Sequence, residues 1–449
     1  MTPDLPTEAP VRGMNERGSS FPAVGANRAE IGFALLILAA GVWVAWRFAA
    51  LGYLPQPFHY RPDETFNDLY KPAWWAHHKG GYDLWQEIYP PLSPVFIRLF
   101  SLPGCYSAAW PDGWMVARGC DWPLRAMLGV FFLANGPLAW LAFRRARLAG
   151  AGPRAVALCL GLPMLYALDR GNLLIPCLTF LMLAEGGFVA WPAARWIAMG
   201  LAMNFKPYLL VVAPGRLARG QWAWLAGVGA AGLTIYLVTL ALEGDGTPFQ
   251  LIRNVIGYGH NRAEGPHYWA SFYYAASYLP LAHMASAGFS FTAGLGTGGV
   301  AALRLAIFAA IRAVQLGAAA CALAACFRPA RVQPMRFAAL LAGLALTTLT
   351  TGSAGYAEVF VVFLVFLEPW RGRLRPLILI AGYLLCVPLD WAIWPVRISA
   401  ARAFLSDRLV DPQFGVSVGQ LIRPGLMLVI QFGLTALNLQ DMLGRQRQT

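Results

Sequence analysis

Charge is scarce in this sequence of 449 residues. Only 13% of the residues are Asp, Glu, Lys or Arg, whereas soluble globular domains carry about 25%. The chain has 22 acidic residues and three lysines, and 58% of its residues are hydrophobic. This composition excludes a soluble domain, and it also excludes disordered and fibrous proteins, which are strongly polar or repetitive.

Motifs for nucleotide, metal and hydrolytic chemistry are also missing. The sequence has no Walker loop, no HExxH, no GxSxG and no GxGxxG placed between a strand and a helix. Its seven cysteines form no CxxC pair, and no Cys/His spacing is typical of a zinc site. We therefore expect no metal and no cofactor, and nucleotide-driven transport is disfavoured.

Long apolar runs fill most of the chain instead. Stretches of about 15–25 residues recur from Ile31 to Leu439, which is enough for about 10–12 membrane-spanning segments. Spans are expected near 31–50, 122–143, 154–168, 172–190, 222–242, 299–326, 335–351, 355–368, 375–394 and 421–440. The sequence therefore predicts an all-α polytopic membrane protein.

The basic residues indicate the orientation of these spans. Arginines occur in small clusters between apolar segments, as the positive-inside rule describes, and they form no contiguous basic face for nucleic acid. We expect one transmembrane domain over 29–440, with a disordered cytosolic tail at 1–28 and a second cytosolic tail at 441–449. The outer loops would then be 51–121, 243–297 and 395–420.

One apolar segment does not fit a simple crossing. Residues 196–214 are followed by Arg216 and Arg219, which belong on the inside, and Lys206-Pro207 lies at the centre of the segment. A full crossing would invert every later loop. We therefore expect two half-helices that enter the membrane and return, an arrangement that often marks a binding site.

The first outer loop carries the densest group of acids. Asp63, Glu64 and Asp68 lie within six residues, among many aromatic side chains. The aromatic residues fit a membrane-interface belt. The acids fit either a solvated loop or a general base for an acceptor hydroxyl, and both interpretations stay open.

Cations inside apolar segments form a second group of candidates. Lys206 is the only lysine in a span, and Arg304 and Arg312 lie on one later span. Such residues snorkel to water, pair with an acid such as Glu358, or face a polar ligand. An anionic lipid phosphate is a ligand that would account for several cations at once.

Further polar positions are weaker candidates. The turn Asp169-Arg170-Gly171-Asn172 fits an ion-paired tight turn or part of a site, and Glu358 begins an apolar run. The second outer loop offers His260, Arg262 and His267, a set that could bind a sugar or a phosphate. Cys105 and Cys120 share the first outer loop, where a disulfide is possible because that compartment can be oxidising.

Four short motifs occur in a characteristic order. They read FNDLY at 66–70, IYPPL at 88–92, DRGNLL at 169–174 and GLAMNFKPY at 200–208. Together they resemble glycosyltransferase family 87, which belongs to the membrane-embedded C-type (GT-C) glycosyltransferases. The resemblance covers the first half of the chain.

The resemblance implies a GT-C-like bundle and an inverting hexosyltransferase, most simply a mannosyltransferase, of the bacterial inner membrane. Its donor would be a polyprenyl-phosphate-linked sugar, its acceptor a lipid or glycan hydroxyl, and its active site would lie on the periplasmic side. Asp68 would be the catalytic base, with Asp63 and Glu64 as reserve candidates. The cations expected at the donor phosphate are Lys206, Arg170, Arg304 and Arg312, and the residues expected to contact acceptor or sugar are Tyr70, Asn172, His260, Arg262, His267 and Glu358.

Two other classes remain open at this point. A transporter or flippase of lipid-linked sugars would also contain buried cations, but it is expected to show inverted repeats, and the sequence shows no repeat. A non-catalytic subunit of envelope assembly would need no acid in the first outer loop.

Overall fold

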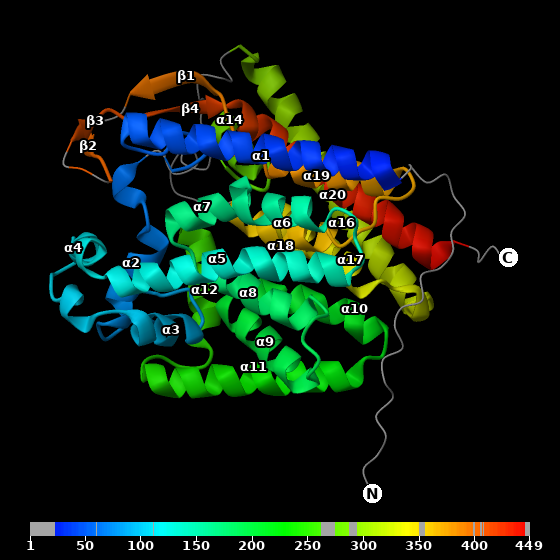
Figure 1. Ribbon diagram of the computed structural model, residues 1–449, viewed down its shortest axis with the longest axis horizontal. Helices are drawn as coiled ribbons and strands as arrows, with labels where there is room; N and C mark the ends of the chain where they lie inside the picture. The colour runs from blue at the N-terminus through cyan, green and yellow to red at the C-terminus, as the bar shows by residue number, and fades with distance from the viewer. Residues whose placement is uncertain are drawn as a thin grey trace, which may run out of the picture.

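Figure 1 shows the chain as a computed structural model, a bundle of roughly parallel helices with smaller elements at its ends. The structure describes residues 23–59, 61–110, 112–261, 274–286, 294–349, 355–397, 400–404, 406 and 408–444. Of the disordered tail expected at 1–28, residues 1–22 lie outside these ranges, whereas residues 23–28 are helical. The segment 262–273, the break at 350–354 and residues 445–449 of the second tail also lie outside them.

Within these described ranges, six helical stretches are long and apolar enough to cross a membrane. They are α1 (Ala23–Leu51), α5 (Trp122–Arg145), the consecutive pair α6 (Ala151–Leu160) and α7 (Leu162–Arg170), α11 (Trp222–Glu243), α16 (Gly296–Phe327) and α20 (Val418–Leu443). Shorter apolar helices are α8 (Leu174–Glu185), α17 (Pro334–Leu344), α18 (Glu358–Val365) and α19 (Leu374–Leu385). The expectation of a helical polytopic membrane protein is thereby confirmed.

The helices divide into a buried centre and an apolar periphery. Every residue of α18 is buried, whereas α11 exposes large apolar side chains such as Leu233 and Leu237. A helix that is apolar on all sides is stable only inside protein or lipid. Helix α18 therefore lies in the protein core, and the outer face of α11 is suited to lipid.

The predicted outer loops meet at one end of the bundle. Figure 1 shows α2 (Asn67–Ala76), α3 (Leu92–Phe100), α4 (Gly113–Cys120) and the β-strands at the same end. Helix α12 (Gln250–Asn261) joins them through Asn254, whose amide donates to the carbonyls of Tyr82 (2.9 Å) and Glu87 (3.1 Å). Gln56 and Gly415 exchange two hydrogen bonds of 2.7 and 3.0 Å.

The predicted inner connections meet at the opposite end, where arginines pair with acids. Arg154 lies 2.6 Å from Glu30, and Arg336 lies 2.7 Å from Glu368. Arg216 pairs with Glu185. The two sets of loops inferred from charge thus segregate to opposite ends of the bundle.

The segment expected to be broken is divided at Lys206. Helix α9 (Pro192–Phe205) ends there, and Lys206 is extended, with φ −138° and ψ 94°. The turn η3 (Pro207–Val212) and helix α10 (Ala213–Ala218) follow. Pro207 has no N–H to continue the helix and disfavours helical geometry in the preceding residue. Figure 1 places α10 at the end of the bundle opposite to α2 and α4.

Short elements connect the helices. The 3-10 turns are η1 (Pro62–Glu64), η2 (Pro103–Tyr106), η3, η4 (Pro329–Arg331) and η6 (Gly355–Ala357), and η5 (Ala345–Leu349) is a π-helical turn. Helix α14 (Leu279–Ser286) precedes α16.

The third outer loop differs from the all-α expectation. Strands β1 (Ala392–Arg397) and β4 (Gln413–Ser417) pair antiparallel, as do β2 (Ala401–Arg402) and β3 (Leu409–Val410). Strand β1 begins within the last residues of the span expected at 375–394, whose helix α19 ends at Leu385. The other strands lie in the expected outer loop, where the helical requirement that lipid imposes on the backbone does not apply.

Cysteine labelling tests the sidedness inferred from charge. Gly294 has open space where a side chain would begin, and Arg371 is exposed at the other end. In a Cys326→Ser background, because Cys326 is an exposed free thiol, an impermeant maleimide should label Gly294→Cys in intact cells. It should label Arg371→Cys only after permeabilisation. The reverse pattern would invert the topology.

Candidate functional site

Asp68 forms the centre of a polar cluster at the loop-bearing end of the bundle. Arg170 Nη2 donates to Asp68 Oδ1 at 2.9 Å, and Asn172 Nδ2 donates to Asp68 Oδ2 at 2.8 Å. Asp68 lies in the first turn of α2, Arg170 is the last residue of α7, and Asn172 follows two residues later. The structure therefore joins two of the motifs, 66–70 and 169–174, through three side chains.

Close backbone approach makes these contacts possible. Phe66 adopts the left-handed conformation, with φ 61°, and its N–H donates to the carbonyl of Asp169 at 2.7 Å. Gly171 also has a positive φ of 66°, and a Cβ there would lie 2.8 Å from side-chain atoms of Phe66 and Leu69. Position 171 thus requires glycine for both its conformation and its space.

Arg170 is shared between two carboxylates. Its Nη1 lies 3.1 Å from Glu64 Oε2, while its Nη2 contacts Asp68. Burial opposes ionisation of Asp68, but attraction to Arg170 and hydrogen bonds from Asn172 and Arg170 outweigh it. The pKa of Asp68 therefore lies below its ordinary value, and the carboxylate is ionised at neutral pH.

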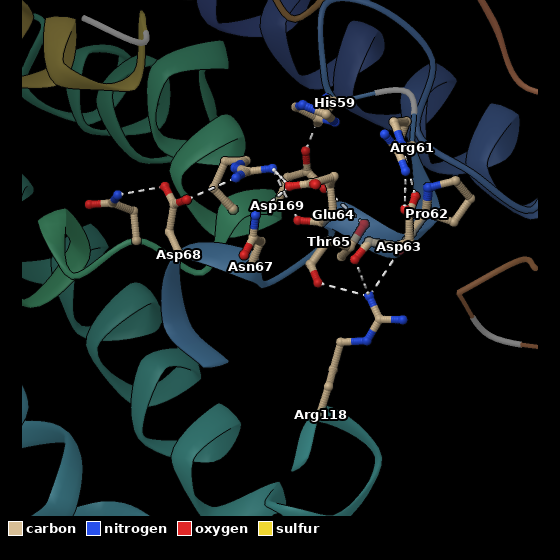
Figure 2. A network of polar contacts seen from close by, with 12 residues as sticks. His59, Arg61, Pro62, Asp63, Glu64, Thr65, Asn67, Asp68, Arg118 and Asp169 are labelled. Carbon is tan, nitrogen blue, oxygen red and sulfur yellow. Dashed lines mark hydrogen bonds and ion pairs between the residues drawn. The ribbon is translucent and has the colours of Figure 1, made fainter. Parts of the chain in front are cut away.

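Asp169 holds the segment that precedes Asp68. Its Oδ2 accepts from the backbone N–H of His59 at 3.1 Å, and its Oδ1 accepts from Thr65 Oγ1 at 3.4 Å. Figure 2 shows His59 and Asp169 together in this network. Burial, with Arg170 nearby, lowers the pKa of His59 well below its ordinary value. Sequence reasoning missed His59, although it is one of few histidines in the first outer loop.

Lys206 approaches the same cluster from the broken segment. Its ammonium lies 5.0 Å from the centre of the Tyr89 ring, and its charge contributes to lowering the pKa of Asp68. Among the residues that the structure describes, Lys206 has no carboxylate at ion-pair distance. The hydroxyl of Tyr208, two residues further on, is buried without a hydrogen-bond partner in the same part of the chain. This cation and this donor are available to an anionic ligand.

Asp63 and Tyr70 lie away from Asp68. Asp63 pairs with Arg61 at 2.5 Å, and Figure 2 shows Asp63 and Asp68 pointing apart. Tyr70 is fully buried, and its hydroxyl donates to the carbonyl of Asp121 at 2.7 Å. Two residues along an α-helix turn the side chain by about 200°, so Tyr70 cannot share the face of Asp68. The expected sugar contact for Tyr70 is thus replaced by a structural one.

Arg304 and Arg312 are not part of the cluster. Both are exposed on α16, and Arg312 donates to Gln315 of the same helix at 2.7 Å. The buried face of α16 contains Ile307, Ile311 and Val314. Arg304, three and seven residues before Ile307 and Ile311, lies on the same side of the helix as these residues but stays exposed, and Arg312 is turned away from that side. The structure therefore does not support the expected phosphate contact for either arginine.

Glu358 belongs to a separate buried network. Its Oε2 accepts from the Tyr274 hydroxyl at 2.9 Å, so the structure does not support the alternative pair with Lys206. Arg423 lies over the Tyr274 ring at 5.4 Å and pairs with Asp390 at 2.7 Å. The side chains of the remaining acceptor candidates, His260, Arg262 and His267, lie outside the described residues.

The cysteines of the first outer loop are bonded to each other. Cys105 and Cys120 form a disulfide with a Cα–Cα distance of 5.7 Å, which is typical for such a bond. In the part of the chain that the structure describes, no three His, Cys, Asp or Glu residues are arranged to hold a metal ion.

Comparison with protein-family models, with curated proteins and with solved structures finds no match for this chain. The resemblance to glycosyltransferase family 87 therefore remains a prediction from the sequence motifs, and the function must be inferred from the site itself.

The shared arginine gives a pH-dependent stability prediction. Arg170→Gln should lower the Tm at pH 7 by several degrees, because two largely buried carboxylates lose their counter-ion. A carboxylate with a lowered pKa contributes stability above its ordinary pKa, about 3.9, and the contribution is lost as the pH falls through the lowered value. The Tm difference from wild type should therefore shrink on acidification below about pH 4.

The control is Arg61→Gln, which removes the exposed pair with Asp63, whose side chains are 49% and 34% exposed. Exposed pairs contribute little, so its Tm should stay close to that of wild type at every pH. An equal loss of Tm in both variants would contradict the larger contribution of Arg170 to stability.

Proposed function

We propose that the chain is a membrane glycosyltransferase of the inverting, GT-C type. It would move a sugar, most simply a mannose-like hexose, from a polyprenyl-phosphate donor to a hydroxyl of a lipid or glycan at the outer face of the membrane. The observation that carries the proposal is an ionised carboxylate, Asp68, near a cation, Lys206. Among the described residues, Lys206 has no carboxylate at ion-pair distance.

Asp68 has the properties of a general base for an alcohol. It is ionised, and Arg170 and Asn172 fix the orientation of both its oxygens. In the proposed reaction, Asp68 takes the proton of the acceptor hydroxyl while the hydroxyl oxygen attacks the anomeric carbon of the sugar. The bond from that carbon to the phosphate oxygen breaks, and the polyprenyl phosphate leaves with the electron pair.

Lys206 would stabilise the departing phosphate. Electrostatic stabilisation of developing charge is usually a large part of catalysis, and the ammonium faces the Tyr89 ring instead of an acid. The contacts of Arg170 with Asp68 and Glu64 support a different role from the expected phosphate binding. We assign Arg170 to the orientation of the base.

The location supports a lipid-carried donor. Asp68 lies beside the ends of apolar helices, at the end of the bundle where α2, α3, α4 and the β-strands gather, which the distribution of arginines predicts to be the outer end. A site facing the outer leaflet has no access to cytosolic nucleotide sugars, whereas a polyprenyl carrier reaches it through the bilayer.

Asp68→Asn should abolish transfer while leaving donor binding intact, because the amide is similar in shape and cannot accept the proton. The measurement is transfer of radiolabelled sugar from polyprenyl phosphate in vesicles that contain the purified protein. Asp63→Asn is the matched control, since Asp63 contacts Arg61 instead of the cluster, and it should transfer normally. Equal transfer by Asp68→Asn and wild type would remove Asp68 from the mechanism.

Lys206→Met should weaken donor binding or turnover by about tenfold to a hundredfold, because a hydrogen bond to a charged group contributes roughly 1.5–3 kcal/mol. Methionine keeps much of the side-chain volume and removes the cost of a buried charge, so the fold should persist. Lys79→Met, at an exposed position of the first loop, should leave both quantities unchanged. Unchanged donor affinity and turnover in Lys206→Met would refute the phosphate role.

A further inference from the structure

Arg118, on α4, donates hydrogen bonds to three backbone carbonyls of the first outer loop. Its Nη1 donates to the carbonyl oxygens of Pro62 at 3.0 Å, Asp63 at 3.1 Å and Thr65 at 3.0 Å. Figure 2 shows these contacts beside the Asp68 cluster. All three carbonyls belong to the short turn that leads directly into Phe66 and α2.

Convergent carbonyl oxygens repel one another unless a donor lies between them. Three carbonyls of η1 and of the residue after it, Thr65, accept from the same nitrogen of Arg118. Phe66, in the left-handed conformation, follows immediately. A non-glycine residue adopts this conformation only when its surroundings enforce it. Arg118 therefore helps to hold the backbone conformation that directs Asp68 toward Arg170.

The guanidinium of Arg118 also lies near two aromatic rings. Its central carbon lies 5.2 Å from the centre of the Phe404 ring and 5.9 Å from that of Trp114. The Phe404 ring lies 5.7 Å from the Phe66 ring. Arg118 thus joins the third outer loop to the residue whose backbone sets the start of α2.

Helix α4 is fixed at its end, so Arg118 has a defined position. Cys120 is bonded to Cys105. The next residue, Asp121, accepts from the Tyr106 hydroxyl at 2.7 Å through its side chain, and from the hydroxyl of Tyr70 on α2 through its carbonyl. Helix α4, which carries Arg118, is therefore attached to α2, the helix that carries Asp68.

Arg118 has no carboxylate at ion-pair distance within the described residues, and burial lowers the pKa of its guanidinium. An arginine held this way is a costly means of adding stability alone, because its charge is compensated only by carbonyl dipoles and aromatic faces.

We infer that Arg118 is a positioning residue for Asp68, acting through the carbonyls of Pro62, Asp63 and Thr65. The effect of Arg118 on the Asp68 carboxylate is inferred from geometry alone. The effect of Arg118 on the reaction rate rests also on the proposed function. Arg118 contacts neither substrate nor reacting atoms in this scheme.

The test compares Arg118→Met and Arg118→Lys with Arg125→Met, a matched change of a half-buried arginine on α5. Arg118→Met should lower kcat about tenfold to a hundredfold with little change in donor KM, because the base is displaced and the phosphate site is not. Arg118→Lys should recover part of the loss, since one nitrogen of Arg118 serves all three carbonyls and an ammonium offers three donors. Arg125→Met should behave like wild type.

The pH profile separates positioning from a merely structural role. If the loop loosens, Asp68 loses part of its contact with Arg170 and Asn172, so its pKa should rise toward the ordinary value. The acid limb of kcat should then move to higher pH in Arg118→Met.

Infrared titration of the Asp68 carboxyl, identified by its absence in Asp68→Asn, measures the same shift without a transfer assay. A raised titration point in Arg118→Met supports the inference even if wild type transfers no sugar, an outcome that would refute only the proposed function. An unchanged titration point in folded Arg118→Met overturns the inference, whatever its activity. Kinetics that match wild type per folded molecule would also overturn it.

Discussion

A charged group inside a membrane protein must find its partner within the protein, because lipid offers none. This constraint accounts for most of the polar architecture. At the end that carries the predicted inner connections, Arg154 pairs with Glu30 and Arg336 pairs with Glu368. At the other end, Arg423 pairs with Asp390, and Arg170 serves both Glu64 and Asp68.

Against this background, Lys206 is an exception that requires a reason. It lies where α9 stops, and its ammonium faces a tyrosine ring instead of an acid. The nearby Tyr208 hydroxyl is also without a partner among the described residues. Structural ion pairs are satisfied in the absence of ligand, whereas a ligand site keeps unmatched charge and donors. The contrast between Lys206 and the paired arginines is the basis for placing the proposed binding site at Lys206.

The bundle was largely predictable from the sequence, and the arrangement of its side chains was only partly so. Long apolar runs specify helices, and Lys206-Pro207 specifies the break, because these features are local. The joining of Asp68 with Arg170 followed only from the resemblance of their motifs. Hydropathy could not tell that Arg304 and Arg312 are both exposed on α16, since lipid and core favour the same side chains. Tyr70 contacts Asp121, and Arg118 contacts carbonyls more than fifty residues away. Neither contact can be inferred from the residues that are adjacent in the sequence.

The complete burial of α18 has a consequence for how the protein is made. Residues 358–365 occupy the centre of the bundle, yet α5, α6 and α7, which contact α18, precede them by about two hundred positions in the chain. During synthesis, those earlier helices enter the bilayer well before their central neighbour exists. Until α18 arrives, the groove that it will fill is open to lipid or to the insertion machinery. The order of translation therefore makes the last third of the chain the step that completes the core, and a truncated chain ending before α18 would leave the earlier helices without their common partner.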